Sequence, residues 1–202
     1  MAQPALRPAR EAALLLLTAV AAAADAISYL GLGKVFPANM TGNTVLMGIG
    51  LAKPDYSSAV RSAVALGGFV TGAALAGAIW GSHRTRTACG LAMEAAMLGA
   101  AAGLWATLGH HPDGGPRYAL IALLGGAMGA QSGVAAGLSV GVSTTYITGT
   151  WTAVSTGVAR LLRPRSARED EMQPRSRLWR QMAVVVCYFG AALLSGYLFV
   201  HV

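Results

Sequence analysis

Residues 118–159 read YALIALLGGAMGAQSGVAAGLSVGVSTTYITGTWTAVSTGVA and contain no Asp, Glu, Lys or Arg. A transmembrane helix needs about 20 apolar residues, so this stretch is long enough for two crossings. Residues 62–83 and 181–202 also lack these four residue types, and each can hold one crossing. The whole chain is 54% hydrophobic and 11% charged, which leaves too few polar residues to cover a water-soluble globule of this size. We therefore predict an all-α membrane protein.

Hydrophobic length divides this single transmembrane domain, residues 1–202, into a polytopic helical bundle of six to seven segments. Two segments, 41–53 and 147–162, are short: the first covers only about 20 Å of a hydrocarbon layer roughly 30 Å thick. Each follows a stretch that does not look helical, because Pro37 disfavours helix at the preceding residue and β-branched residues favour extended backbone. We predict two half-helices after extended breaks, which either cross with the help of the extended residues or re-enter and return to their own side. The full-length segments are 12–32, 60–81, 88–108, 117–138 and 179–200.

The two breaks, VFPANMTGN at 35–43 and VSTTYITGT at 142–150, indicate an internal repeat. Aligning Thr41-Gly42 with Thr148-Gly149 also superposes Val35 on Val142, Gly50 on Gly157 and Ala52 on Ala159. The chain is predicted to hold three elements at 12–81, a linker helix at 88–108, and three elements again at 117–200. Crossing half-helices would make the repeats parallel, and re-entrant ones would make them inverted.

The basic residues predict the orientation in a bacterial inner membrane. The net charge is +7, but seven of the fifteen Lys and Arg residues lie in residues 160–180, as in a cytoplasmic loop of a membrane protein. This placement argues against nucleic acid as a partner. Both arrangements of the half-helices put the N-terminus in the cytoplasm, so counting charges does not separate them. Residues 7–26 imitate a signal peptide, but the apolar run continues to Leu32, and we expect an uncleaved first helix.

Asp25 is the first candidate for function, because a carboxylate within an apolar helix costs several kcal/mol unless it is paired or hydrated. It is interpreted as a proton- or cation-coupling group, or a substrate anchor, that faces the bundle interior. The alternative is that Asp25 caps the adjacent break or pairs with Lys34.

The ANMTGN stretch is more specific. Short polar side chains surround a glycine at the start of a half-helix, where free backbone N–H groups and the positive end of the helix dipole attract polar ligand groups. The alternative is that Thr41 is an N-cap and that the asparagines satisfy the backbone. The same pattern recurs in the second half. The predicted substrate or ion pathway therefore comprises Asp25, Asn39, Thr41, Gly42, Asn43, Gln131, Thr145, Tyr146, Thr148, Gly149 and Thr150.

Glu94 is a candidate relay carboxylate, although a position near the membrane interface would equally let it reach water or nearby arginines. Gln131 lies mid-segment, where an amide more often bridges helices than binds substrate. Cys89, Cys187 and the His110-His111 pair show no metal-ligand spacing, so no metal is predicted. No nucleophile-base pair or cofactor motif is present, and we expect neither an enzyme nor a cofactor.

The stretches DAISYLGLGKVFPANMTGN and GAQSGVAAGLSVGVSTTYITGT resemble the YoaK-like family of small bacterial membrane proteins. The likeness covers nearly the whole chain from about residue 14. Where the family tends to have Gln-Asn, this sequence has Gln131-Ser132. The resemblance implies fold and location, and it brings no substrate.

Two functions follow from these patterns. The first is a secondary transporter or permease for an unknown small solute, since polar breaks at equivalent positions of two repeats are how many transporters form a midplane site. The second is a non-transporting membrane scaffold or assembly module, in which the breaks serve only packing. The expected partners are the lipid bilayer, a small solute and, in self-assembly, further copies of the chain.

Overall fold

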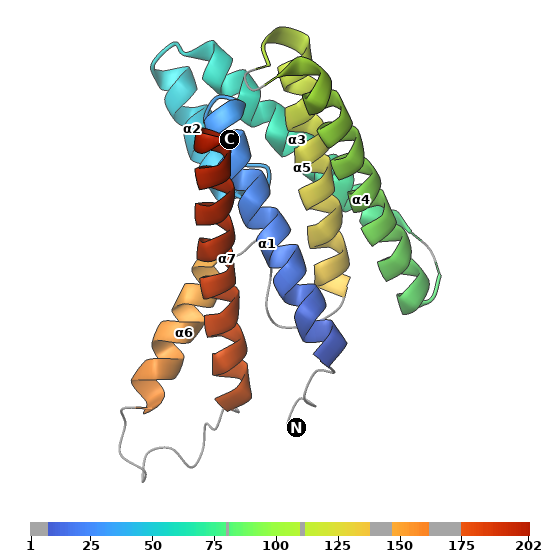
Figure 1. Ribbon diagram of the computed structural model, residues 1–202, viewed down its shortest axis with the longest axis vertical. Helices are drawn as coiled ribbons and strands as arrows, with labels where there is room; N and C mark the ends of the chain where they lie inside the picture. Colours follow the sequence, from blue (N-terminus) through green and yellow to red (C-terminus); the bar gives the residue numbers. More distant parts are fainter. Residues whose placement is uncertain (1–7, 80, 110–111, 138–146, 162–174) are drawn as a thin grey trace.

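The computed structural model describes residues 8–79, 81–109, 112–137, 147–161 and 175–202. Within these ranges the regular structure is entirely helical, which confirms the predicted all-α class. The helices, shown in Figure 1, are α1 (Pro8–Gly31), α2 (Met40–Ala52), α3 (Tyr56–Ala78), α4 (His83–Leu108), α5 (Gly114–Gly137), α6 (Ile147–Leu161) and α7 (Arg175–His201).

Five of these helices are long and apolar enough to cross a membrane, namely α1, α3, α4, α5 and α7. The other two, α2 and α6, have 13 and 15 residues, too few to span the hydrocarbon core as regular helices. The chain is therefore a polytopic helical bundle with five full-length spans and two half-helices. Several helices begin before the predicted hydrophobic segments, because polar residues such as Asp55 and Ser82 cap their first turns.

Helix α5 is the centre of the bundle, and α3 is its most extensive neighbour. Small residues allow these two helices to approach closely: a Cβ added to Gly72 would lie 2.0 Å from the carbonyl oxygen of Gly126, and one added to Gly129 would lie 2.0 Å from that of Phe69. Such contacts let transmembrane helices pack through their backbones. Helix α4 covers another side of α5, and Leu120 and Ile121 are fully buried between α3, α4 and the break that follows α1.

The first half-helix is re-entrant. The backbone carbonyl of Gly33, just after α1, accepts a hydrogen bond from Nε of Arg61, 3.0 Å away in the second turn of α3. The end of α1 and the beginning of α3 therefore lie at the same membrane face, although α2 lies between them in sequence. If α2 crossed the membrane, these two groups would be separated by about 30 Å of hydrocarbon. The chain instead descends from Gly31 to Ala38 and climbs back through α2.

The turn between α2 and α3 is closed by backbone hydrogen bonds and by a cap. Gly50 lets α2 approach the first turn of α3, where an added Cβ would lie 2.8 Å from the Ala59 nitrogen. Asp55 accepts hydrogen bonds from the Ser58 backbone N–H and the Ser57 hydroxyl. The Ser58 N–H, and then the Ser57 hydroxyl, hold the pKa of the Asp55 carboxyl below its ordinary value. The result is a tight α2–α3 hairpin at one membrane face.

Helices α6 and α7 lie on the opposite side of α1 from α4 (Figure 1). Among the described helices, α7 packs mainly on α1, and α6 packs on α7. In Figure 1, α1, α2, α4 and α7 run upward, whereas α3, α5 and α6 run downward. Helix α2 thus ends at the upper face, and α6 ends at the lower face, where α7 begins.

Substitution of Gly72 by Ala tests the close packing of α3 and α5. The added methyl carbon would lie 2.0 Å from the Gly126 carbonyl oxygen, a steric clash that the two helices must move apart to relieve. We therefore expect a loss of about 1–3 kcal/mol in unfolding free energy. Gly67→Ala on the same helix is the matched control, because a Cβ there meets nothing within 4 Å. The measurement is thermal unfolding in detergent, and equal melting temperatures for the two variants would contradict the packing described above.

Candidate functional site

The site begins at the end of α1, where the chain leaves the helix without ending its hydrogen bonding. The N–H groups of Leu32 and Lys34 donate to the carbonyls of Ser28 and Tyr29. Gly33 and Lys34 adopt positive φ values of 88° and 62°, a left-handed conformation that commonly ends a helix. The reversal sends residues 35–39 back down along α1, with Leu32, Val35 and Ala38 buried against the bundle.

Asn43 holds the backbone of this descending segment. Its Oδ1 accepts from the Phe36 N–H at 3.0 Å, and its Nδ2 donates to the Phe36 carbonyl at 2.5 Å. The side chain is fully buried. One amide therefore satisfies both backbone groups of a residue outside any helix, which is the requirement for irregular backbone at membrane depth.

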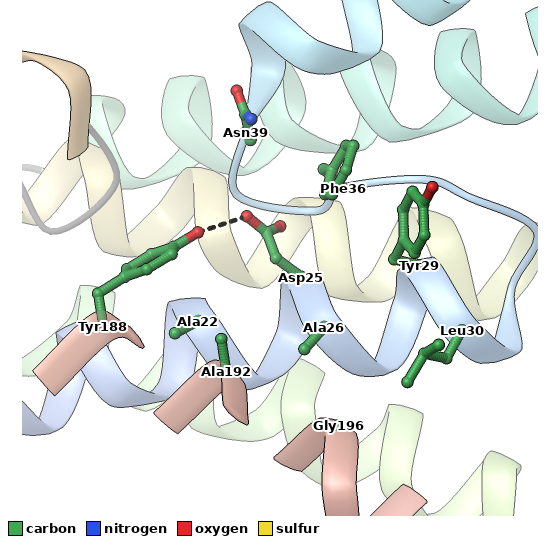
Figure 2. Close-up of a pocket in the computed structure, with 10 residues that line it drawn as sticks. All are labelled: Ala22, Asp25, Ala26, Tyr29, Leu30, Phe36, Asn39, Tyr188, Ala192 and Gly196. Carbon is green, nitrogen blue, oxygen red and sulfur yellow. Dashed lines mark hydrogen bonds between the residues drawn. The ribbon is translucent and has the colours of Figure 1, made fainter. Parts of the chain in front are cut away.

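Asp25 joins three parts of the bundle. Its Oδ1 accepts from the Ala38 backbone N–H at 2.7 Å, and its Oδ2 accepts from the Tyr188 hydroxyl at 2.9 Å. Figure 2 shows the carboxylate pointing from α1 toward the break, with Tyr188 reaching it from α7. Asp25 is buried, and it makes the capping contact with the break that was the alternative to a role in function. The two oxygens together tie α1, the break and α7.

A pocket of about 480 Å³ opens beside this carboxylate, between α1, the break and α7. Asp25, Asn39 and Tyr188 supply its polar groups (Figure 2), and the rest of its described wall is aromatic or aliphatic. Tyr29 and Phe36 lie on the side of Asp25 away from Tyr188, with their rings stacked at 5.2 Å. This volume is within the usual range for small-molecule sites.

A second, smaller pocket of about 100 Å³ is lined by the beginnings of both half-helices. Asn39 and Thr41 line it from the beginning of α2, and Thr148 lines it from the beginning of α6. Tyr188 and Asn39 border both pockets. The structure therefore gathers Asp25, Asn39, Thr41 and Thr148, four of the residues that the sequence patterns selected, around one tyrosine.

The polar residues of this site have different functions in the fold. Asn39 is the N-cap of α2 and accepts from the Gly42 N–H at 3.0 Å. Gly42 lies close to the Asn39 amide and the Phe36 ring, whereas Asn43 faces the backbone instead of a pocket. Thr150 is buried, and Gly149 is exposed. Thr145 and Tyr146 lie outside the described residues.

Gln131 and Glu94 lie away from both pockets. Gln131 is fully buried on α5, and its Nε2 donates to the Leu17 carbonyl of α1 at 2.9 Å, so it bridges two helices. Glu94 is also buried, and its Oε2 has no hydrogen-bond partner in the part of the chain that is described. Among the described residues Glu94 forms no ion pair with Arg84 or Arg86, and its role as a relay carboxylate stays a prediction.

The electrostatics of the site follow from the half-helix ends. A helix N-terminus is equivalent to about half a positive charge, and Asp25 accepts a hydrogen bond from the Ala38 N–H, two residues before the first residue of α2. The beginning of α6 reaches the same region through Thr148. Two such ends offset about one carboxylate charge, and no Lys, Arg or His is among the described residues that line either pocket.

Tyr188 and Arg61 are site residues that the sequence patterns did not select. Tyr188 lies in the uncharged stretch 181–202, where a phenol within the membrane needs a hydrogen-bond partner. That requirement was a usable signal for Tyr188. Arg61 lies at the beginning of the predicted segment 60–81 and was given no role there, yet its side chain bonds to the Gly33 carbonyl just after α1.

A family model described as "Protein of unknown function (DUF1275)" matches residues 13–201. The chain belongs to this family. It is also 31% identical over 195 residues to the UPF0700 transmembrane protein YoaK of Bacillus subtilis (strain 168), with 92% of this chain and 83% of the relative covered. No solved structure gives a significant match. These findings confirm the YoaK-like resemblance and the membrane architecture.

In this DUF1275 protein, Asn43→Leu tests whether the Asn43 amide supports the break. Leucine keeps the branch at Cγ but cannot pair with the Phe36 N–H and carbonyl, and each unpaired buried group costs about 1–3 kcal/mol. Asn39→Leu is the matched control, because it removes one exposed N-cap bond worth about 1 kcal/mol. Thermal unfolding in detergent should show the larger loss for Asn43→Leu, and the reverse order would refute the structural role.

Proposed function

We propose that this protein is a secondary transporter or permease for a small solute, whose pathway passes Asp25 and Tyr188 between the beginnings of the two half-helices. The observation on which this rests is that α2 and α6 both begin at the pocket that contains Asn39, Thr41 and Thr148. Discontinuous helices whose N-termini face a common site are a recurrent device of secondary transporters.

The directions of the helices support an inverted repeat. Helices α1, α2 and α3 run up, up and down, and helices α5, α6 and α7 run down, down and up (Figure 1). The second set is therefore the first set turned over in the membrane, with α4 as the linker. Inverted repeats suit alternating access, because each half can adopt the conformation of the other.

A non-transporting scaffold or assembly module is the second candidate. The specific observation in its favour is that the side-chain amides of Asn43 and Gln131 form hydrogen bonds with the protein's own backbone. A module, however, would gain stability by filling the space next to a buried carboxylate. The pocket of about 480 Å³ beside Asp25 is instead left open, which favours solute binding. Neither candidate assigns a chemical reaction to the site.

We further propose a bacterial inner-membrane location with the N-terminus in the cytoplasm. Residues 160–180 contain seven Lys and Arg residues and include the end of α6 and the beginning of α7, which lie at the lower face in Figure 1, where α4 also begins with Arg84 and Arg86 in its first turn. Lys34 and Lys53 follow the ends of α1 and α2, and Arg61 and Arg117 lie in the first two turns of α3 and α5, and these helix ends lie at the upper face. The positive-inside bias therefore assigns the end where α6 terminates to the cytoplasm.

The pathway is tested by Asp25→Asn and Tyr188→Phe in proteoliposomes, with a panel of small solutes and a proton-sensitive dye inside. We expect Asp25→Asn to abolish flux of any transported solute, and Tyr188→Phe to reduce it about tenfold, the value of one charge-assisted hydrogen bond. Tyr197→Phe on the same helix is the control, because Tyr197 is 60% exposed. An Asp25→Asn variant that matches the wild type in every flux assay would contradict the proposal.

The orientation is tested by single cysteines in a variant from which Cys89 and Cys187 have been removed. Ser57 and Ser82 are both exposed and lie at the beginnings of α3 and α4. With a cytoplasmic N-terminus and a re-entrant α2, an impermeant maleimide should label Ser57→Cys from the periplasm and Ser82→Cys from the cytoplasm. The opposite labelling would contradict a cytoplasmic N-terminus for this fold.

A further inference from the structure

We propose that the pocket beside Asp25 recognises an organic cation, an ammonium group attached to an apolar or aromatic body. The inference rests on the proposed function in taking this pocket as the ligand site, and it adds the chemical class of the ligand. Its basis is the combination of one buried carboxylate with three aromatic rings in a cavity of about 480 Å³.

The carboxylate has capacity for a ligand. An ionised carboxylate offers about four lone-pair sites. The Ala38 N–H and the Tyr188 hydroxyl bond to two of those of Asp25, and the Asn39 backbone N–H also interacts with the carboxylate, which leaves about one site for a ligand in addition to the one that Tyr188 can vacate. The Tyr188 bond is made by a rotatable hydroxyl from a different helix, so a stronger donor can replace it. An ammonium group donates three charge-assisted hydrogen bonds, which are stronger than the bond from a neutral phenol.

The rest of the wall favours a cation with an apolar body. Tyr29 and Phe36 flank Asp25 on one side and Tyr188 on the other (Figure 2). The faces of aromatic rings attract cations, and the attraction is stronger where water is excluded. Ala22, Ala26 and Leu30 form an aliphatic floor from α1. This wall suits hydrocarbon attached to the charged group.

The same wall disfavours other ligand classes. A metal cation such as Ca²⁺ or Mg²⁺ requires about six oxygen ligands, more than Asp25, Asn39 and the tyrosine hydroxyls are arranged to supply. An anion would meet Asp25 with no Lys, Arg or His among the described residues that line the pocket. A neutral solute carries no positive charge for the carboxylate and the aromatic rings to attract, so it would bind more weakly than a cation of the same size.

Three probes of nearly equal size separate these classes: phenethylammonium, 2-phenylethanol and phenylacetate. Each is added to the purified wild-type protein in nanodiscs, and thermal stabilisation and calorimetric titration are measured. We expect phenethylammonium to stabilise the protein and to bind at least tenfold more tightly than the alcohol, with no stabilisation by the acid. Equal stabilisation by the alcohol or the acid, or no stabilisation by phenethylammonium up to about 10 mM, would overturn the inference.

Two variants locate the binding. Asp25→Asn should reduce the affinity for phenethylammonium at least tenfold, to that for the alcohol. Tyr29→Leu should weaken it severalfold, whereas Tyr56→Leu should not, because Tyr56 is exposed at the beginning of α3. If Asp25→Asn does not fold, the wild-type order of the three probes and the Tyr29 variant still decide. Unchanged affinity in Tyr29→Leu would place the cation elsewhere.

The outcome is independent of the transport assay. Selective binding of phenethylammonium without flux of any solute would retain the amine site and remove the transporter. Flux of some other solute, together with no preference for the ammonium probe, would retain the transporter and remove the amine site.

Discussion

The hydrogen bond from the Ala38 backbone to Asp25 meets the constraint on which the rest of this structure depends. Hydrocarbon offers no partners to N–H and C=O groups, so a non-helical segment within a membrane must obtain all of them from the protein. Here Asp25 accepts a hydrogen bond from the Ala38 N–H, and Asn43 bonds both the N–H and the carbonyl of Phe36. Arg61 donates a hydrogen bond to the Gly33 carbonyl. These three side chains come from α1, α2 and α3. The break therefore holds the first three helices together.

The same hydrogen bonds explain how a carboxylate is tolerated at this depth. Asp25 lies against the positive end of α2, whose dipole stabilises a negative charge, and Tyr188 adds a donor from α7. A carboxylate and a helix end that offset each other cost less in a low-dielectric surrounding than either alone. The arrangement accounts for a polar group and a half-helix that would each be unfavourable in isolation. It also leaves the carboxylate accessible from one open side, where the larger pocket lies.

The sequence predicted the helical class, the five long spans and the position of the first half-helix, because hydrophobic length and Pro37 act locally. The path of α2 was not predictable, since both paths left the N-terminus in the cytoplasm. Residue partners were also beyond reach: Tyr188 lies 163 positions from Asp25, and no local pattern joins them. Asn43 was selected as a pathway residue because an asparagine amide can bind polar ligand groups. In the structure both the oxygen and the nitrogen of this amide bond to the backbone of Phe36, which has no helical partners. Thr41 and Thr148 were selected by the repeat, and they do line one pocket.

The division of contacts shows where this bundle can change shape. Helices α3, α4 and α5 are joined by close contacts, and at Gly72 and Gly129 a single added carbon would collide with the neighbouring backbone. Helices packed this closely cannot slide past one another without steric clashes, so we expect these three helices to move as one unit. Helices α6 and α7 meet the other described helices mainly through α1, and the described part of the protein leaves most of α7 exposed. The Asp25–Tyr188 hydrogen bond joins α1 to α7, and the Asp25–Ala38 hydrogen bond joins α1 to the break before α2. A ligand that replaces Tyr188 on Asp25 would therefore act directly on the contact between α1 and α7, and the proposed transport requires such a coupling between ligand binding and helix packing.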